Sequence, residues 1–162
     1  MNRFFKTTAV AALGAACFAQ TLRQAGQNAA VTMGTAADAA HLAESDYTGT
    51  LAREYNQLEA ENKMKWGWIR PTQTSYNFTG GDALVAFAEA NNMAVRGHNL
   101  LWHLDNPAWL TQGTFTPAQL KQIMQDHIAT VVQHWAGKVY AWTSSTKPFR
   151  QYPQRSARIH LE

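Results

Sequence analysis

The chain has 162 residues, of which 46% are hydrophobic, 15% charged and 11% aromatic. These proportions are typical of a folded globular protein and exclude a disordered or collagen-like chain. The length suits one ordinary domain or a piece of a larger one, and no apolar run is long enough for a mature helix that crosses a bilayer. The single cysteine excludes an internal disulfide framework and a multi-cysteine zinc site.

The net charge of +3 comes from the two ends of the chain. The last twenty residues hold four basic side chains, Lys147, Arg150, Arg155 and Arg158. Setting these aside with Arg3, Lys6 and the acidic Glu162 leaves 8 of the 14 basic residues against 10 of the 11 acidic ones. The body is therefore slightly acidic, and we expect no nucleic-acid partner, because such a partner needs a basic face.

The N-terminus has the organisation of an export signal. A basic start with Arg3 and Lys6 precedes an apolar, alanine-rich run over 7–18 that ends in small residues. A buried helix is the alternative, but the length and the basic flank favour a signal peptide over residues 1–19. Cleavage after Ala19 would remove Cys17, and a lipid anchor at Cys17 is disfavoured because the preceding residues 14–16 lack the leucine usually found there. We expect a secreted or periplasmic protein with no membrane contact after cleavage.

Strands and helices alternate along the body of the chain. Alternating or apolar runs predict strands at residues 31–36, 57–61, 93–101 and 139–142. Helices are predicted at 47–55, from a capping box at 79–82 to residues 91–92, and from Thr116 and Pro117 to Gly137. This order predicts an α/β fold with a parallel sheet.

Two patterns predict which side chains are buried and where the fold ends. In the second strand, Leu58 and Ala60 face one side while Glu59 and Glu61 face the other. Trp135 lies on the apolar stripe of the last helix and is assigned to the core. After Trp142 the sequence has no periodicity, and nothing in it is expected to continue the fourth strand.

Tryptophans are prominent, and their flat faces suit stacking on sugar rings, although core packing is the simpler use. The six that follow the signal are Trp66, Trp68, Trp102, Trp109, Trp135 and Trp142. Trp66, Trp102 and Trp109 follow strand ends, which is where ligand sites of parallel sheets lie.

Polar residues also gather after two strands. Glu61, Asn62 and Lys65 can grip vicinal hydroxyls through charge-assisted hydrogen bonds, with a solvated loop as an equal alternative. His98 and His103 are five residues apart and so face opposite sides of a strand, which argues against a shared metal ion and favours a hydrogen-bonded histidine. No metal or cofactor is expected. Ordinary surface or helix-face positions are expected for the remaining candidates, His41, His127, His134, Glu89 and Asp126.

Several motifs together resemble a known family. The runs 61–66 (Glu-Asn-Lys-Met-Lys-Trp) and 96–103 (Arg-Gly-His-Asn-Leu-Leu-Trp-His), then 107–109 (Pro-Ala-Trp), are similar to glycoside hydrolase family 10, the endo-β-1,4-xylanases, and 34–36 is similar to its first strand. The resemblance covers residues 22–142. It implies the N-terminal half of a (β/α)8 TIM barrel, with about four strands and three helices and a site at the carboxyl ends of the strands.

The resemblance also implies roles for particular residues. Glu61, Asn62 and Lys65 would bind xylose units of xylan or xylo-oligosaccharides on the non-reducing side of the cleaved bond. His98 and Trp102 would shape the site around the reacting sugar, with His103 close by. One position departs from the family, since Asp105 stands where many members have glutamine.

The chemistry implied by the family is retaining hydrolysis by two glutamates about 5–5.5 Å apart. The acid/base belongs to a Trp-Asp-Val-Val-Asn-Glu segment at the end of the fourth strand, and the nucleophile to the seventh strand. After Trp142 this chain reads Thr-Ser-Ser-Thr-Lys-Pro over 143–148, so both catalytic glutamates are missing. We therefore expect no xylan cleavage by the chain as written.

The genetic code offers a reason for the missing motif. If 143–148 are encoded ACG TCG TCA ACG AAG CC, one G placed in front regroups the bases to encode Asp-Val-Val-Asn-Glu-Ala. We interpret residues 20–142 as family sequence and residues 143–162 as an out-of-frame tail that follows loss of one base. Thr143 and Lys147 then stand where the restored frame has the aspartate and the acid/base glutamate.

Three functions stay open for the chain as written. It is a truncated copy of a secreted xylanase, a non-catalytic sugar-binding fragment that uses residues such as Trp66 and Trp102, or a structural or interaction protein without sugar chemistry. Half a barrel has unpaired edge strands and exposed apolar surface, so we also expect low stability with a tendency toward aggregation or domain swapping.

Overall fold

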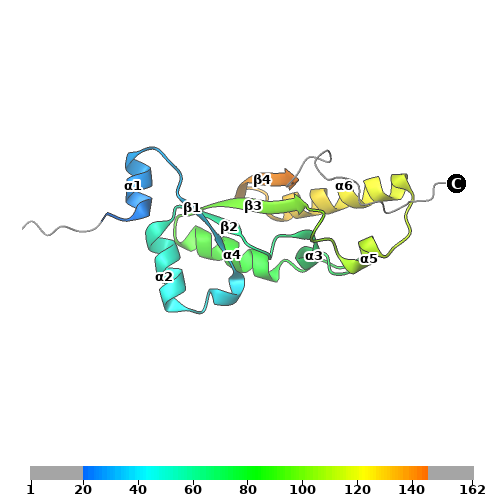
Figure 1. Cartoon of the computed structure of the whole chain (residues 1–162), viewed down its shortest axis with the longest axis horizontal. Helices are drawn as coiled ribbons and strands as arrows, with labels where there is room; N and C mark the ends of the chain where they lie inside the picture. Colours follow the sequence, from blue (N-terminus) through cyan, green and yellow to red (C-terminus); the bar gives the residue numbers. More distant parts are fainter. Residues whose placement is uncertain (1–19, 146–162) are drawn as a thin grey trace, which may run out of the picture.

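The computed structural model describes residues 20–145, so the predicted signal peptide and most of the predicted tail lie outside the described part. Four parallel strands form one sheet in chain order (Figure 1). They are β1 (Gly34–Ala37), β2 (Gln57–Ala60), β3 (Ala94–Leu101) and β4 (Val139–Ser145). The helices are α1 (Leu22–Asn28), the 3-10 helix η1 (Ala39–His41), α2 (Ser45–Glu54), α3 (Trp66–Ile69), α4 (Thr79–Ala90), α5 (Ala108–Thr111) and α6 (Pro117–His134). The predicted alternation is confirmed.

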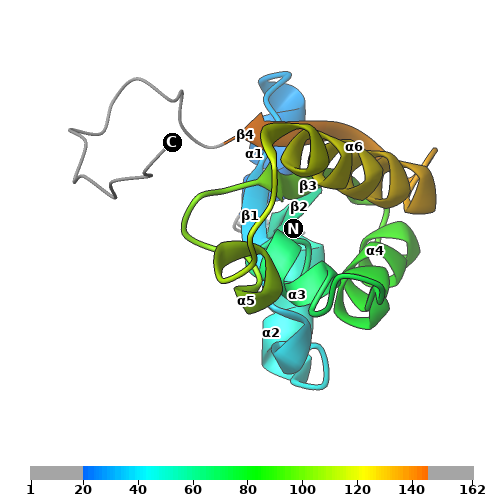
Figure 2. The same ribbon diagram turned by 90° about the vertical axis from the view of Figure 1, so that its right-hand side faces the viewer.

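One face of the sheet carries the core. Leu58 and Ala60 on β2 are fully buried beneath the helices, as the alternating pattern predicts. Trp135, 1% exposed, belongs to the same cluster and confirms its assignment from the α6 stripe. The opposite face carries half-buried polar side chains, among them Glu59 and His98. Figure 2, seen from the end to which the strands point, shows α2, α4 and α6 outside the sheet. None of the helices within residues 20–145 is long and apolar enough to cross a membrane.

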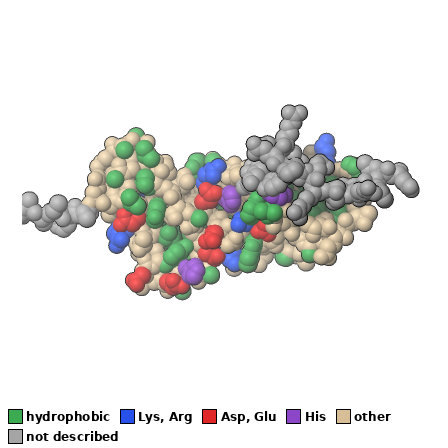
Figure 3. All heavy atoms as spheres, viewed as in Figure 1, with side chains coloured by type: hydrophobic (Ala, Val, Ile, Leu, Met, Phe, Trp, Pro, Cys, Tyr) green, Lys and Arg blue, Asp and Glu red, His purple; other side chains and the backbone are tan. Residues whose placement is uncertain are grey.

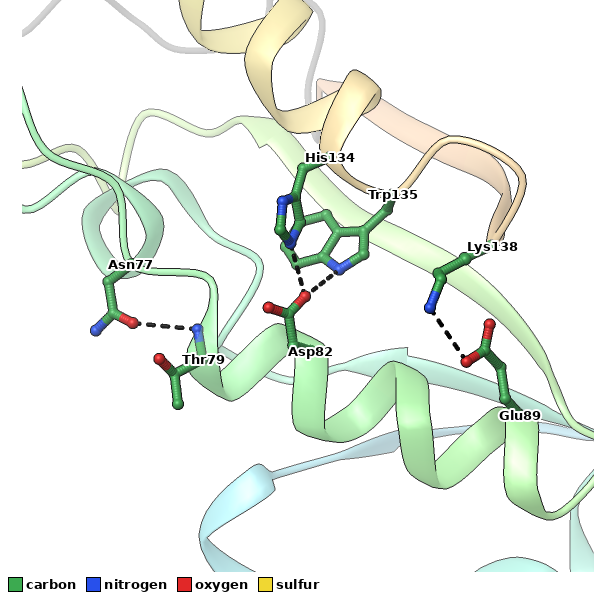
Figure 4. A network of polar contacts seen from close by, with 7 residues as sticks. All are labelled: Asn77, Thr79, Asp82, Glu89, His134, Trp135 and Lys138. Atoms are coloured by element: carbon green, nitrogen blue, oxygen red, sulfur yellow. Dashed lines mark hydrogen bonds and ion pairs between the residues drawn. The ribbon is translucent and has the colours of Figure 1, made fainter.

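The start of α6 is as predicted, and the start of α4 is not. At α6, the Thr116 hydroxyl accepts from the Gln119 N–H while the Gln119 side chain accepts from the Thr116 N–H, which makes a capping box. At α4, Thr79 is already helical and donates its N–H to Asn77 Oδ1 at 3.1 Å. The capping box predicted at 79–82 is wrong because Asp82 is engaged with α6 instead (Figure 4).

Asp82 holds α4 against the end of α6. Its Oδ1 lies 2.7 Å from His134 Nε2 and accepts a hydrogen bond from Trp135 Nε1 at 2.9 Å (Figure 4). A second link on the same side joins Lys138 to Glu89 at 3.3 Å, between two exposed side chains. The first link serves a nearly buried indole N–H and should matter more than the second.

We expect Asp82→Ala to lower the free energy of unfolding by about 1–2 kcal/mol, because it leaves the Trp135 N–H without its acceptor. Glu89→Ala removes an exposed ion pair at the other end of α4 and should cost less than about 0.5 kcal/mol. Urea unfolding followed by far-UV circular dichroism measures both. Equal losses in the two variants would show that the Asp82 contacts contribute no more than a surface pair.

Three features of the fold are absent from the sequence predictions. α1 is fixed by Arg23, which donates to Ala52 O at 2.8 Å, Asn91 O at 3.0 Å and Asn92 O at 2.6 Å at the ends of α2 and α4. The four-residue helices α3 and α5 are too short to show a periodicity. β4 does not end at Trp142: it continues to Ser145, because backbone pairing with β3 tolerates these polar residues.

Candidate functional site

Three of the predicted sugar-binding side chains meet at the carboxyl ends of the strands. Lys65 Nζ donates to Asn62 Oδ1 at 2.8 Å and lies 4.8 Å from the ring centroid of Trp102. Asn62 and Lys65 belong to the loop after β2, while Trp102 follows β3. In Figure 2, α3 and α5, which continue these loops, lie at the end to which the strands point. The cluster offers an amide, an ammonium and a half-exposed indole face.

Glu61 and His98 face a different part of the same end. Together with Glu59 and residues 34–36 they line an open cleft of about 600 Å³ over β1, β2 and β3. Glu61 is exposed immediately after β2, so its carboxylate is available to a ligand. The cleft lies on the polar face of the sheet, which is the inner face in a closed barrel.

His98 is a neutral histidine that lies among charged side chains. Burial lowers the pKa of His98, and Lys65 and Arg96 lower it further against the opposing charge of Glu59. His98 Nδ1 lies 3.0 Å from Glu59 Oε1 but at an angle that makes no hydrogen bond. Arg96 donates to the other oxygen, Glu59 Oε2, at 3.3 Å. The His98–Asn99 peptide bond is cis. Glu59 was missed as a site residue, although its alternation with Glu61 places it on the same face.

The loop after β3 packs on the loop after β2. The Gly67 N–H donates to Asp105 O at 3.3 Å, and a Cβ at Gly67 would overlap the Asp105 carboxylate. Burial raises the pKa of Asp105, and Lys65 opposes this shift. His103 is exposed with its ring edge-on to Trp102, 6.3 Å between centroids. His103 and Asp105 therefore lie at the rim of the cluster. Within residues 20–145, no group of three metal-ligating side chains is arranged to hold a metal ion.

Of two other tryptophans expected near a ligand, Trp66 belongs to the core, and Trp109 is half-buried and packs against it. Trp66 is 3% exposed and stacks on His127, with centroids 4.3 Å apart. Trp109 lies edge-on to Trp66 and donates its N–H to Arg70 O at 2.9 Å. His127 was expected on a helix surface, but it is wholly buried, because Trp66 of α3 stacks on it from a distant part of the sequence.

Comparisons with known proteins agree with this geometry. The family model described as Glycosyl hydrolase family 10 matches residues 21–157. Endo-1,4-beta-xylanase A of Phanerodontia chrysosporium is 41% identical over 118 residues, which are 72% of this chain and 29% of that protein. Endo-1,4-beta-xylanase B of Thermotoga neapolitana is 42% identical over 96 residues, 59% of this chain and 28% of that protein.

Solved structures give the same result. Xylanase 10B from Thermotoga petrophila RKU-1, in complex with xylobiose, superposes with a TM-score of 0.72 at 40% identity and covers 75% of this chain and 38% of that one. The fold is therefore that of part of a (β/α)8 barrel. The chain belongs to glycoside hydrolase family 10.

The match also places the described residues within the family fold. The chain spans about 30% of the length of the first curated relatives that it matches. Family members are (β/α)8 barrels, and β1 to β4 with their helices form the incomplete N-terminal half of one. The fold class expected from the resemblance is confirmed.

Proposed function

We propose that this chain is the first half of an exported endo-1,4-β-xylanase and binds xylan or xylo-oligosaccharides without cleaving them. The observation that carries this proposal is the cluster of Asn62, Lys65 and Trp102 at the strand ends. A relative with 40% identity was solved with xylobiose, which supports a pentose oligomer as the ligand. Export rests on the signal-like start of the sequence.

The side chains of the cluster have complementary tasks. The Lys65 ammonium keeps one hydrogen bond to Asn62 and has two further N–H groups for sugar hydroxyl oxygens. The exposed Glu61 carboxylate accepts from hydroxyl donors at the edge of the cleft. The Trp102 ring offers an apolar face to a pyranose ring. His98 is neutral at pH 7 because its pKa is lowered, so it can both donate to and accept from a sugar.

Cleavage would need a pair of catalytic carboxyl groups, which we propose that this chain lacks. Retaining hydrolysis uses two carboxyl groups about 5–5.5 Å apart on either side of the bond. Among residues 20–145, Glu61 and Asp105 are the carboxylates of the loops that follow β2 and β3, and the family resemblance gives neither a catalytic role. Glu59 is already engaged by Arg96.

We propose that the reading frame changes after Trp142, because adding one base there restores the family motif over 143–148. The Thr143 hydroxyl is buried without a hydrogen-bond partner, which costs about 1–3 kcal/mol. Residues before Trp142, such as Trp66 and Asn99, also have buried polar atoms without a partner, so this hydroxyl does not bear on the reading frame. In the restored frame, position 143 holds the aspartate that leads to the acid/base glutamate.

Calorimetric titration with xylotriose tests the binding site, and chromatography of the same samples tests cleavage. We expect saturable binding, no shorter sugars, and at least tenfold weaker binding by Lys65→Met, a loss of about 1.4 kcal/mol. Lys121→Met removes an exposed lysine of α6 and serves as the matched control, with unchanged affinity. Absence of binding by the unaltered chain, or equal losses in both variants, would contradict the proposed site; release of xylose or xylobiose would contradict the proposed inactivity.

A further inference from the structure

Trp68 is an exposed tryptophan to which the proposed function gives no role. Its side chain is 49% exposed, whereas Trp66 on the same short helix is 3% exposed and stacks on His127. Two positions on a helix are about 200° apart, so the helix that buries the ring of Trp66 directs Trp68 away from the core. A solvent-exposed indole offers a flat apolar face, which suits stacking on a sugar ring.

Trp68 lies next to the sugar-binding cluster on the surface of α3. Lys65 of the cluster is the N-cap of this helix, and its carbonyl oxygen accepts from the Trp68 N–H at 3.1 Å. Side chains three positions apart at the start of a helix are neighbours on its surface. The surface that carries the Lys65 ammonium therefore continues to the ring of Trp68.

Lys63 holds the ring of Trp68 from one side. Its ammonium nitrogen lies 3.6 Å from the centroid of the indole. The aliphatic part of Lys63 packs so closely on Gly80 of α4 that a Cβ at this glycine would overlap it. With Lys63 over one face, the exposed half of Trp68 is left to the other face and the edge of the ring.

A second contact fixes α3 relative to the loop that carries Trp102. The Gly67 N–H donates to Asp105 O at 3.3 Å, and the Asp105 carboxylate packs where a Cβ of Gly67 would be. The indoles of Trp68 and Trp102 are thus carried by two segments in direct contact. Rings that are held in place before a ligand arrives lower the entropic cost of binding it.

The charges around the two rings favour an uncharged ligand. Lys63 lies near the Asp38 carboxylate, and Lys65 lies near that of Asp105. On the face seen in Figure 3, acidic, basic and histidine side chains of the described part are interspersed, without a large patch of one sign. A neutral chain of sugars matches such a surface better than a polymer with a charge on each unit.

We propose that Trp68 is an outer stacking platform for xylose units that extend beyond the cluster of Asn62, Lys65 and Trp102. The Lys63 ammonium, beside the platform, donates to hydroxyl oxygens of the same units. This inference rests on the proposed function and narrows its ligand, because a platform outside the cluster is reached by long xylan chains and not by short oligosaccharides.

Calorimetric titration with xylotriose and xylohexaose tests the platform. The unaltered chain should bind xylohexaose about tenfold more tightly than xylotriose. Trp68→Ala should weaken xylohexaose binding by about tenfold and leave xylotriose binding unchanged. Trp68→Tyr keeps a flat ring and should retain most of the gain. Leu22→Ala alters a residue that is 46% exposed on α1, far from α3 in Figure 1, and should change neither affinity. Circular dichroism checks that each variant is folded.

The outcomes separate the platform from the cluster. Binding of xylotriose together with a xylohexaose affinity that Trp68→Ala leaves unchanged would overturn the platform alone. Equal losses for both sugars in Trp68→Ala would overturn its position outside the cluster. A chain that binds neither sugar would overturn the cluster and the platform together. Xylohexaose binding that depends on Trp68, without binding of xylotriose, would support the platform and contradict the proposed cluster.

Discussion

Lowering the pH from 7 to 4 is expected to destabilise the folded chain by about 3 kcal/mol through His127 alone. Burial, together with the nearby charge of Arg70, lowers the pKa of His127 to about 4, so the folded protein resists protonation. The unfolded chain takes up the proton below about pH 6.5. Stability from this group is therefore complete above pH 6.5, falls as the pH decreases, and levels off below about pH 4.

Urea unfolding at half-unit pH steps measures this loss. His127→Phe keeps an aromatic ring between Trp66 and Tyr76 and removes the titrating group, so its stability should fall much less between pH 6.5 and 4. His41→Gln removes an exposed histidine instead and should retain the loss seen in the unaltered chain. If His127→Phe follows the same curve as the unaltered chain, His127 is not the source.

Trp135→Ala is expected to cost about 3–5 kcal/mol, enough to unfold a marginally stable domain. The ring packs edge-on to Phe78 with centroids 5.2 Å apart, and against Trp142 at 5.8 Å. The ring also fills the space next to Gly81 of α4, where any Cβ would overlap it. Only glycine at this position leaves room for the ring. Its removal would leave a cavity next to Gly81, Phe78 and Trp142.

Trp68→Ala provides the matched comparison, because Trp68 is 49% exposed and contacts the Lys63 ammonium from one side. Its loss should be below about 1 kcal/mol. Chemical unfolding followed by circular dichroism compares the two variants without relying on tryptophan fluorescence. A Trp135→Ala variant that unfolds at the same urea concentration as Trp68→Ala would contradict the central place of Trp135 in the core.

Short sequence patterns correctly predicted the structural features that depend on residues close together in the chain. The alternation in β2 and the capping residues of α6 are decided within a few positions, and both are as expected. Asp82 shows the limit: its spacing from Thr79 fits a capping box, but its partners are 52 and 53 residues away on α6. The position of His127 was mispredicted for the same reason, since the Trp66 ring that covers it comes from α3.

The site was predictable to a similar extent. Asn62 and Lys65 are three residues apart, so their contact follows from one short loop. Trp102 joins them from a different strand, as its position after a strand end and the family resemblance both indicated. Trp66 follows the end of β2, as Asn62 and Lys65 do, yet its side chain is buried in the core. The position of a residue after a strand does not decide the direction of its side chain.

Two parts of the account stay predictions. The signal peptide over residues 1–19 lies outside the described part. The proposed frame change falls inside β4, and the family match extends past it to residue 157. The backbone of β4 is compatible with either reading, since strand pairing depends little on which side chains follow Trp142.

The frame change after Trp142 is the central claim, and sequencing the source DNA onward from the Trp142 codon tests it most directly. The bases after that codon are then translated in the reading frame shifted by one base. The account predicts an open frame that begins Asp-Val-Val-Asn-Glu and continues through the remaining strands of the barrel to a second catalytic glutamate. That result would hold whether the missing base is a true deletion or an error in the recorded sequence. An early stop codon, or a shifted frame without these glutamates, would contradict the account.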